Sequence, residues 1–182
     1  PSGWRVVQSV GAVSTVTPGT MQVALKPNEV LPLGTRVRTG DTGQVLLVRG
    51  EEQIILDRNS EIVVDGERGI ITRVRQQVGT ALFSIGKKRD PYFEVNTPYI
   101  AALVKGTTFT VRVSRGQSDV SVIEGAVQVA SRDRSAVTLL KQGTTGSVKS
   151  ARPKEIQIIR QGRVERRVTR NEGGWEIGRA HV

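Results

Sequence analysis

The stretch from Thr97 to Ser131 constrains the fold of this chain more than any other. Apolar and polar residues alternate along it with a period of two, most regularly between residues 108 and 114. Three glycines interrupt the alternation: Gly106, Gly116 and Gly125. Such alternation between glycines is typical of half-buried strands in an antiparallel sheet. The stretch therefore predicts consecutive antiparallel strands.

Similar strand signals recur about every eight to twelve residues from Trp4 to Val148, with turn dipeptides such as Pro18-Gly19 between them. No segment shows a helical period. We therefore expect an all-β fold of many short antiparallel strands, arranged as a barrel, a sandwich or a β-roll, with little or no helix. A glycine precedes a strand signal at three places: Gly79, Gly106 and Gly125. This loose recurrence is compatible with a β-roll but is not a strict repeat.

The chain is expected to form one all-β domain over residues 1–150, followed by a basic extension over residues 151–182. The extension contains eight Lys/Arg and four Glu. Its pattern predicts one or two strands and then a loose tail from Thr169 onward. Trp175 is the exception in that tail, since an indole ring is expected to dock either on the body of the protein or on a partner.

Composition excludes several kinds of site. The chain has no cysteine, and its one histidine, His181, is the penultimate residue. Disulfides, thiolate catalysis, cysteine-ligated zinc and a Ser-His-Asp triad are therefore not expected. The adjacent Glu51 and Glu52 would point to opposite faces of a strand and so would not converge. We assign no catalytic, cofactor-binding or metal-ligating residues and expect no enzymatic activity.

The net charge of +10 permits two interpretations: a polyanionic partner, or a solvated basic surface. Arginines two residues apart, such as Arg36 and Arg38, suit the outward face of a strand. Only seven aromatic residues accompany the charge, and single-stranded nucleic acid binds to exposed aromatic rings. We therefore expect no nucleic-acid partner.

The sequences of several segments resemble those of the FecR domain family. These segments are LPLGTRVRTGDTGQVLLVRGEEQIILDRNSEIVVD, VGTALFSI, YFEVNTPYIAALVKGTTFTV and VSVIEGAVQV, and together they cover roughly residues 30 to 150. Among the residues that match the family pattern, ten are expected to build the fold rather than contact a ligand: Gly34, Thr39, Gly43, Gly79, Thr97, Pro98, Gly106, Thr107, Phe109 and Gly125.

The resemblance implies a periplasmic, all-β regulatory module. The family's name-giving members are transmembrane regulators that hold a sigma factor in the cytoplasm and contact a TonB-dependent receptor in the periplasm. This sequence lacks the cytoplasmic anti-sigma segment and the membrane helix, and its opening resembles the soluble, exported members. We therefore expect a periplasmic or exported protein, with any signal peptide or anchor absent from this chain.

Two functions follow from these observations. The first is a protein-interaction module of the bacterial cell envelope, in which an exposed strand edge pairs with a partner, possible edges being the N-terminal strand and the segment after Ser150. The alternative is binding of cell-wall polysaccharide, for which the rings expected near the surface would be Trp4, Tyr92, Tyr99 and Trp175. Candidate partner-binding residues lie in the basic extension: Arg160, Arg163, Arg166, Arg167, Arg170 and Trp175.

Overall fold

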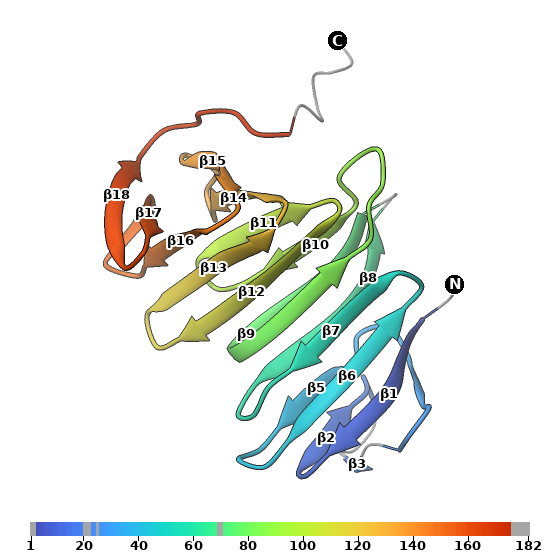
Figure 1. Ribbon diagram of the computed structural model, residues 1–182. Helices are drawn as coiled ribbons and strands as arrows, with labels where there is room; N and C mark the ends of the chain where they lie inside the picture. Colours follow the sequence, from blue (N-terminus) through green and yellow to red (C-terminus); the bar gives the residue numbers. More distant parts are fainter. Residues whose placement is uncertain (1–2, 20–22, 25, 69–70, 176–182) are drawn as a thin grey trace.

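The computed structural model describes residues 3–19, 23–24, 26–68 and 71–175. Within these ranges the chain forms eighteen β-strands and no helix, which confirms the predicted all-β class. No helix able to cross a lipid bilayer therefore occurs in the described ranges. The strands form one hydrogen-bonded network folded into two layers, which we call sheet A and sheet B (Figure 1).

Sheet A has the strand order β4-β1-β6-β7-β9-β12-β13-β16-β17-β18. Its strands are β1 (Trp4–Val10), β4 (Val30–Leu31), β6 (Gln44–Arg49), β7 (Glu52–Leu56), β9 (Ile71–Ile85), β12 (Thr107–Ser114), β13 (Gln117–Glu124), β16 (Thr144–Lys149), β17 (Arg152–Arg160) and β18 (Arg163–Val168). Figure 1 shows β1 and β18 near opposite ends of this layer. The predicted domain boundary near residue 150 falls at the turn between β16 and β17.

Sheet B has the order β3-β2-β5-β8-β9-β10-β11-β14-β15 and shares β9 with sheet A. Its other strands are β2 (Val13–Val16), β3 (Val23–Ala24), β5 (Arg36–Thr39), β8 (Glu61–Arg68), β10 (Phe93–Asn96), β11 (Ile100–Val104), β14 (Ala126–Ser131) and β15 (Val137–Lys141). Among the pairings of these named strands, β9–β10 is parallel and the rest are antiparallel.

The long strand β9 connects the two layers. Its first half pairs with β8 and β10 in sheet B, and its second half pairs with β7 and β12 in sheet A. The change of layer occurs at Gly79, whose φ of +94° strongly disfavours a side chain. Gln76 is fully buried beside it, and its Nε2 donates to the carbonyl oxygens of Gly79 (3.0 Å) and Val111 (2.9 Å). The sequence indicated only a new strand after Gly79, because a bend within a strand leaves the same glycine signal as a turn.

A second corner carries the chain from β13 in sheet A to β14 in sheet B. Gly125 has a φ of +90°, and a Cβ at this position would overlap the Thr107 side chain. The Thr107 hydroxyl donates to the carbonyl oxygens of Glu124 (2.8 Å) and Ala126 (3.2 Å), on either side of that glycine. The corner is therefore held by one buried hydroxyl that leaves no room for a larger residue.

The core lies between the layers and contains a chain of four aromatic rings. Phe83 stacks on Phe109 with ring centres 5.0 Å apart and lies 6.0 Å from Phe93, which meets Trp4 edge-on at 6.1 Å. Trp4 and Tyr92 are only 2% and 6% exposed, so the expectation that these two rings lie near the surface was wrong. Tyr99 packs against the core and is partly buried. Alternation shows which side chains of a strand point to the same face. It does not show which of these side chains another element of the fold covers.

Candidate interaction site

The hairpin of β17 and β18 ends sheet A. Its strands pair from Ile156 with Val168 to Arg160 with Arg163, across a turn in which Gln161 and Gly162 have positive φ. Among the described strands, β18 pairs with β17 only. One edge of β18 therefore presents backbone N–H and C=O groups that no strand in the described part of the chain satisfies.

The other end of sheet A is more closed. Near its start β1 pairs with β4, through Trp4 with Leu31 and Arg5 with Val30, and it also pairs with β6 on its other side. The Val6 N–H donates to the Glu29 carbonyl at 2.8 Å, which extends this cover by one residue. Of the two edges indicated by the sequence, the C-terminal one is therefore the more open.

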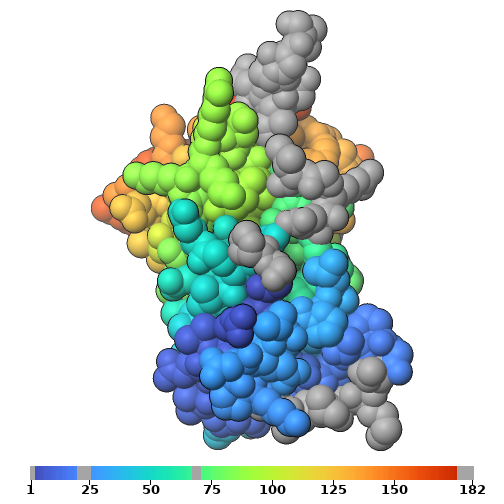
Figure 2. Space-filling model, turned by 90° about the vertical axis from the view of Figure 1, so that its right-hand side faces the viewer, coloured from blue at the N-terminus to red at the C-terminus, as the bar shows by residue number. Residues whose placement is uncertain are grey.

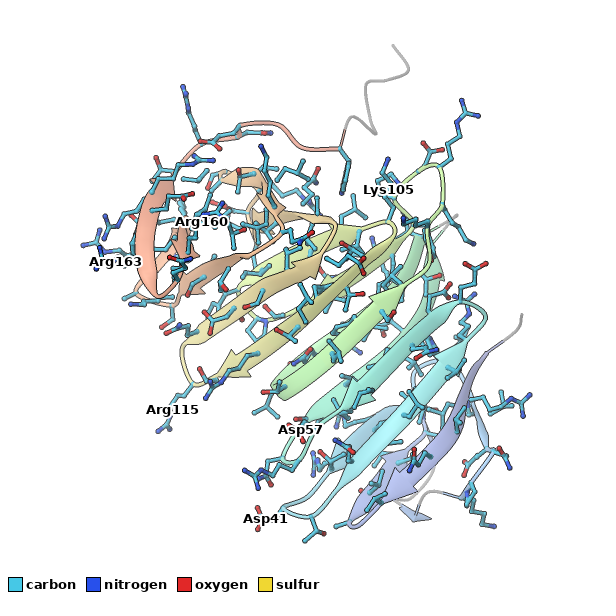
Figure 3. The ribbon with its side chains drawn as sticks, viewed as in Figure 1. Asp41, Asp57, Lys105, Arg115, Arg160 and Arg163 are labelled. Atoms are coloured by element: carbon cyan, nitrogen blue, oxygen red, sulfur yellow. The ribbon has the colours of Figure 1, made fainter. Side chains whose placement is uncertain are left out.

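Four of the candidate arginines lie on this hairpin with exposed side chains. Arg160 pairs with Glu165 (2.9 Å) and Arg167 with Glu155 (3.6 Å). Arg163 makes no ion pair with any described residue, and its neighbour Val164 is 42% exposed. Figure 3 places Arg163 at the end of the sheet, on the outer side of the hairpin. The open edge is thus lined by guanidinium groups and an exposed valine.

The fourth of these, Arg166, is engaged in a different way. Its guanidinium forms a two-pronged pair with the Glu172 carboxylate, at 2.7 and 3.0 Å. This hydrogen bonding lowers the pKa of Glu172 and raises that of Arg166. Glu172 also accepts a hydrogen bond from the Thr138 hydroxyl at 2.9 Å. Arg166 therefore ties β18 to the segment that follows it.

That segment, Thr169–Trp175, crosses the edge of sheet B at β15. We call it the strap. The Val137 N–H donates to the carbonyl of Arg170 (3.2 Å), and the Glu172 N–H donates to the carbonyl of Val137 (2.8 Å). The strap ends with the indole of Trp175 against β11 and β14, so this candidate contacts the body of the protein. The rest of the expected loose tail, residues 176–182, lies outside the described residues.

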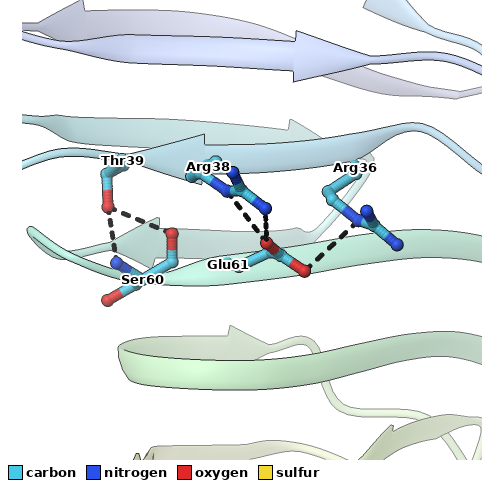
Figure 4. A network of polar contacts seen from close by, with 5 residues as sticks. All are labelled: Arg36, Arg38, Thr39, Ser60 and Glu61. Atoms are coloured by element: carbon cyan, nitrogen blue, oxygen red, sulfur yellow. Dashed lines mark hydrogen bonds and ion pairs between the residues drawn. The ribbon is translucent and has the colours of Figure 1, made fainter. Parts of the chain in front are cut away.

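The ten family-pattern residues lie at corners, turns and core positions of the fold. Thr39 illustrates their role, since its hydroxyl accepts from the Ser60 N–H (2.9 Å, Figure 4) and donates to the Asp57 carbonyl. Thr97 is similar, because its hydroxyl accepts from the Ile100 N–H (2.9 Å) and contacts the Ser118 hydroxyl (2.8 Å). Of the rest, Gly34, Gly43, Pro98 and Gly106 lie at turns or strand ends, and Gly79, Thr107, Phe109 and Gly125 make the contacts already described.

Much of the positive charge on sheet B is neutralised by buried carboxylates, which sequence reasoning missed. Glu61 is 8% exposed and pairs with both Arg36 (3.2 Å) and Arg38 (2.7 Å), as Figure 4 shows. Glu94 pairs in the same way with Arg73 (3.1 Å) and Arg134 (3.6 Å). Glu61 and Glu94 lie on different elements of the fold from the arginines that they pair with. Only the strand register therefore brings these charges together. This face therefore offers less free charge than the composition suggests.

Another missed residue is Glu52, buried at the start of β7. Its carboxylate lies 3.2 Å from the hydroxyl of Tyr92, which also donates to the Gly86 carbonyl at 2.9 Å. Burial raises the pKa of Glu52. Gly86 begins the β9–β10 loop, which projects from the molecule in light green in Figure 2. The contacts of Tyr92 with Glu52 and Gly86 fix the base of this loop.

In the described ranges no cluster of three or more His, Cys, Asp or Glu side chains is arranged to hold a metal ion.

Comparison with known proteins identifies the family of this chain. A profile described as FecR protein matches residues 35–128, which is more than half of the chain. The chain belongs to the FecR family. The family is typically associated with the cell envelope and its members are regulatory, which supports a role in signal transduction. A search of curated proteins found no match.

Solved structures show the same fold. Two crystal structures of a proposed anti-sigma factor from Parabacteroides distasonis ATCC 8503 superpose with TM-scores of 0.60 and 0.58, at 20% and 19% sequence identity. The match covers 72% and 71% of this chain, but only 61% and 60% of the other protein. This chain therefore matches less than two thirds of that protein's length.

Proposed function

We propose that this FecR-family chain is a non-enzymatic protein-interaction module of bacterial envelope signalling. Its partner would add an extended segment to the open edge of β18. In this scheme the module acts in the periplasm or as an exported protein. It relays a signal of the kind that links a TonB-dependent receptor to a sigma factor. The observation that carries the proposal is the edge of β18 that pairs with none of the described strands.

The charges around that edge specify the partner's chemistry. Arg160, Arg163 and Arg167 surround the outer strand, while Glu165 is the acid on β18 itself. An extended segment with alternating acidic and apolar residues would place carboxylates by the arginines and an apolar side chain by Val164. Backbone hydrogen bonds would supply affinity, and the charges would supply orientation and speed of association.

Polysaccharide binding is the weaker alternative. A sugar platform needs exposed rings, but Trp4 and Tyr92 are buried and Trp175 is covered on one side by Lys105, whose Nζ lies 4.7 Å from the ring centre. The described rings therefore do not form a stacking surface. Sedimentation with purified peptidoglycan at low and high salt tests this alternative directly, because binding by charge alone is lost at high salt.

The edge proposal is tested with a fluorescent peptide of alternating Glu and Val. Arg163→Glu should weaken its binding at least about fivefold, and high salt should do the same. Arg115→Glu is the matched control, because Arg115 is likewise an exposed arginine but lies in the turn between β12 and β13 (Figure 3). Amide hydrogen exchange should slow along β18 when the peptide binds. Equal binding by both variants, or protection located elsewhere, would contradict the proposal.

A further inference from the structure

The strap occupies the edge of sheet B as a bound peptide would. Two backbone hydrogen bonds bracket Val137, one to the Arg170 carbonyl and one from the Glu172 N–H, and Asn171 forms a parallel bridge with the same residue. This is the pattern of a strand added to an exposed edge. The strap thus shows the backbone geometry that a bound segment would adopt at this edge.

Two side chains anchor the strap at its ends. The Glu172 carboxylate is held by Arg166 and Thr138. Three residues later, the indole Nε1 of Trp175 donates to the Leu103 carbonyl (3.0 Å), and its backbone N–H donates to Oε1 of Gln128 (2.6 Å). Lys105 lies over the ring, close to the end of the described chain in Figure 3. The site therefore recognises a carboxylate and an indole at a fixed spacing.

Both residues between the anchors are glycines, and each position has a structural reason to favour glycine. Gly173 has a φ of +86°, and a Cβ on Gly174 would overlap the side chain of Gln128. A segment with larger residues at these positions would be strained at the first and would displace Gln128 at the second. The sequence Glu-Gly-Gly-Trp is thus fitted to this surface.

The strap is a surface ligand and not part of the core. Val168, the last residue of β18, is 1% exposed, whereas Thr169 to Glu172 are exposed and Gly173 to Trp175 are only partly covered. No residue of the strap buries an aliphatic side chain between the sheets. Its release would therefore leave the core intact.

We propose that β11, β14 and β15 form a peptide-binding site for an extended segment carrying a carboxylate and, three residues on, an indole. The chain's own strap fills this site as an intramolecular ligand. A partner segment of the same acid–small–small–indole chemistry displaces it. The site goes beyond the proposed β18 edge and shares only Arg166 with it, so a segment that binds at β18 and draws Arg166 away from Glu172 also loosens the strap.

The test opens the site in the full chain and supplies the ligand from outside. Glu172→Gln combined with Trp175→Ala removes both anchors of the strap. A fluorescein-labelled peptide, RNEGGW, should bind this variant at least about tenfold more tightly than it binds the natural chain, because a tethered strap competes at millimolar effective concentration. The peptide RNEAAW is the matched control and should bind at least about tenfold more weakly than RNEGGW. Circular dichroism and thermal unfolding verify that the variant is folded.

Selective binding of RNEGGW to the opened variant supports the site. Equal binding of the two peptides, or no gain on opening the site, overturns it. Arg163→Glu added to the opened variant should leave RNEGGW binding unchanged, so failure of the β18 proposal and failure of this one are separable. If the double variant does not fold, acrylamide quenching of Glu172→Gln replaces it. Trp4 is buried, so only release of Trp175 increases quenching, and unchanged quenching overturns the proposal.

Discussion

The glycine corners and the β17–β18 hairpin both contain glycines at positive φ, yet their surroundings are opposite. At the corners, a Cβ on Gly79 or Gly125 would overlap Ser60 or Thr107. In the hairpin turn, Gly162 has a φ of +77°, and a Cβ added there would meet no atom within 4 Å. The same backbone shape therefore builds the fold in one region and leaves a surface open for binding in the other. Substitutions should separate the two roles.

The largest effect is expected at a corner. Gly79→Ala combines an unfavourable φ with overlap on the backbone of Ser60, and should cost at least about 3 kcal/mol of unfolding free energy. Gly162→Ala, with the same φ class and open space, should cost only about 1 kcal/mol. Urea denaturation measures both. Similar losses for the two variants would mean that packing does not distinguish the corner from the hairpin.

The next effect concerns the buried amide that holds the bend of β9. Gln76→Ala leaves the carbonyl oxygens of Gly79 and Val111 without their side-chain donor, and should cost about 1–3 kcal/mol. Gln157→Ala on the hairpin is the control. Gln157 is only partly buried and makes no side-chain hydrogen bond with a described residue, so we expect a change within about 0.5 kcal/mol. Thermal unfolding of both variants checks the difference, and a neutral Gln76→Ala would contradict it.

A smaller effect should appear in the pH dependence of stability. Burial raises the pKa of Glu52 above 4.5, against the influence of Arg49 and Lys88. The folded protein then holds this proton more tightly than the unfolded chain does. The stabilisation is complete below pH 4.5 and is lost as the pH rises through the folded pKa. Glu52→Gln should flatten the dependence of the urea midpoint on pH between pH 4.5 and the raised pKa of the folded protein. Glu51→Gln is the control. An unchanged profile would argue against a buried, proton-binding Glu52.

The smallest effect on stability is expected at the strap. The Arg166 pair lowers the pKa of Glu172, so its contribution is present above pH 4.5 and is lost as the pH falls through the folded pKa. Acidification should therefore shift the emission of Trp175 to longer wavelength, and Glu172→Gln should show that shift already at pH 7. Global unfolding should change little, because the strap lies outside the core. A fluorescence change that coincides with global unfolding would contradict a separately released strap.

Local patterns predicted the regular parts of this protein well. The strands β12, β13 and β14 lie where alternation between Gly106, Gly116 and Gly125 places them. Strand periodicity is a local property, because successive side chains point to opposite faces whatever the strand pairs with. The family resemblance depends partly on these same glycine-bounded segments. The match of the FecR profile confirmed it.

Long-range contacts were not predictable in this way. The burial of Trp4, the pairing of Glu61 with two arginines and the continuity of β9 through Gly79 all depend on which strands become neighbours. A single sequence contains no direct signal for that pairing. The basic hairpin residues were identified from composition, but the engagement of Arg166 with Glu172 required the strap to fold back across β15.

The sequence by itself determined the all-β class, most strand positions and the membership of the FecR family, because these follow from local alternation and from residues that turns and corners require. Only the tertiary structure decided which edge is open and which is covered. Whether an edge is free depends on where distant segments end: β4 partly covers β1, and the strap crosses β15, while the outer edge of β18 pairs with none of the described strands.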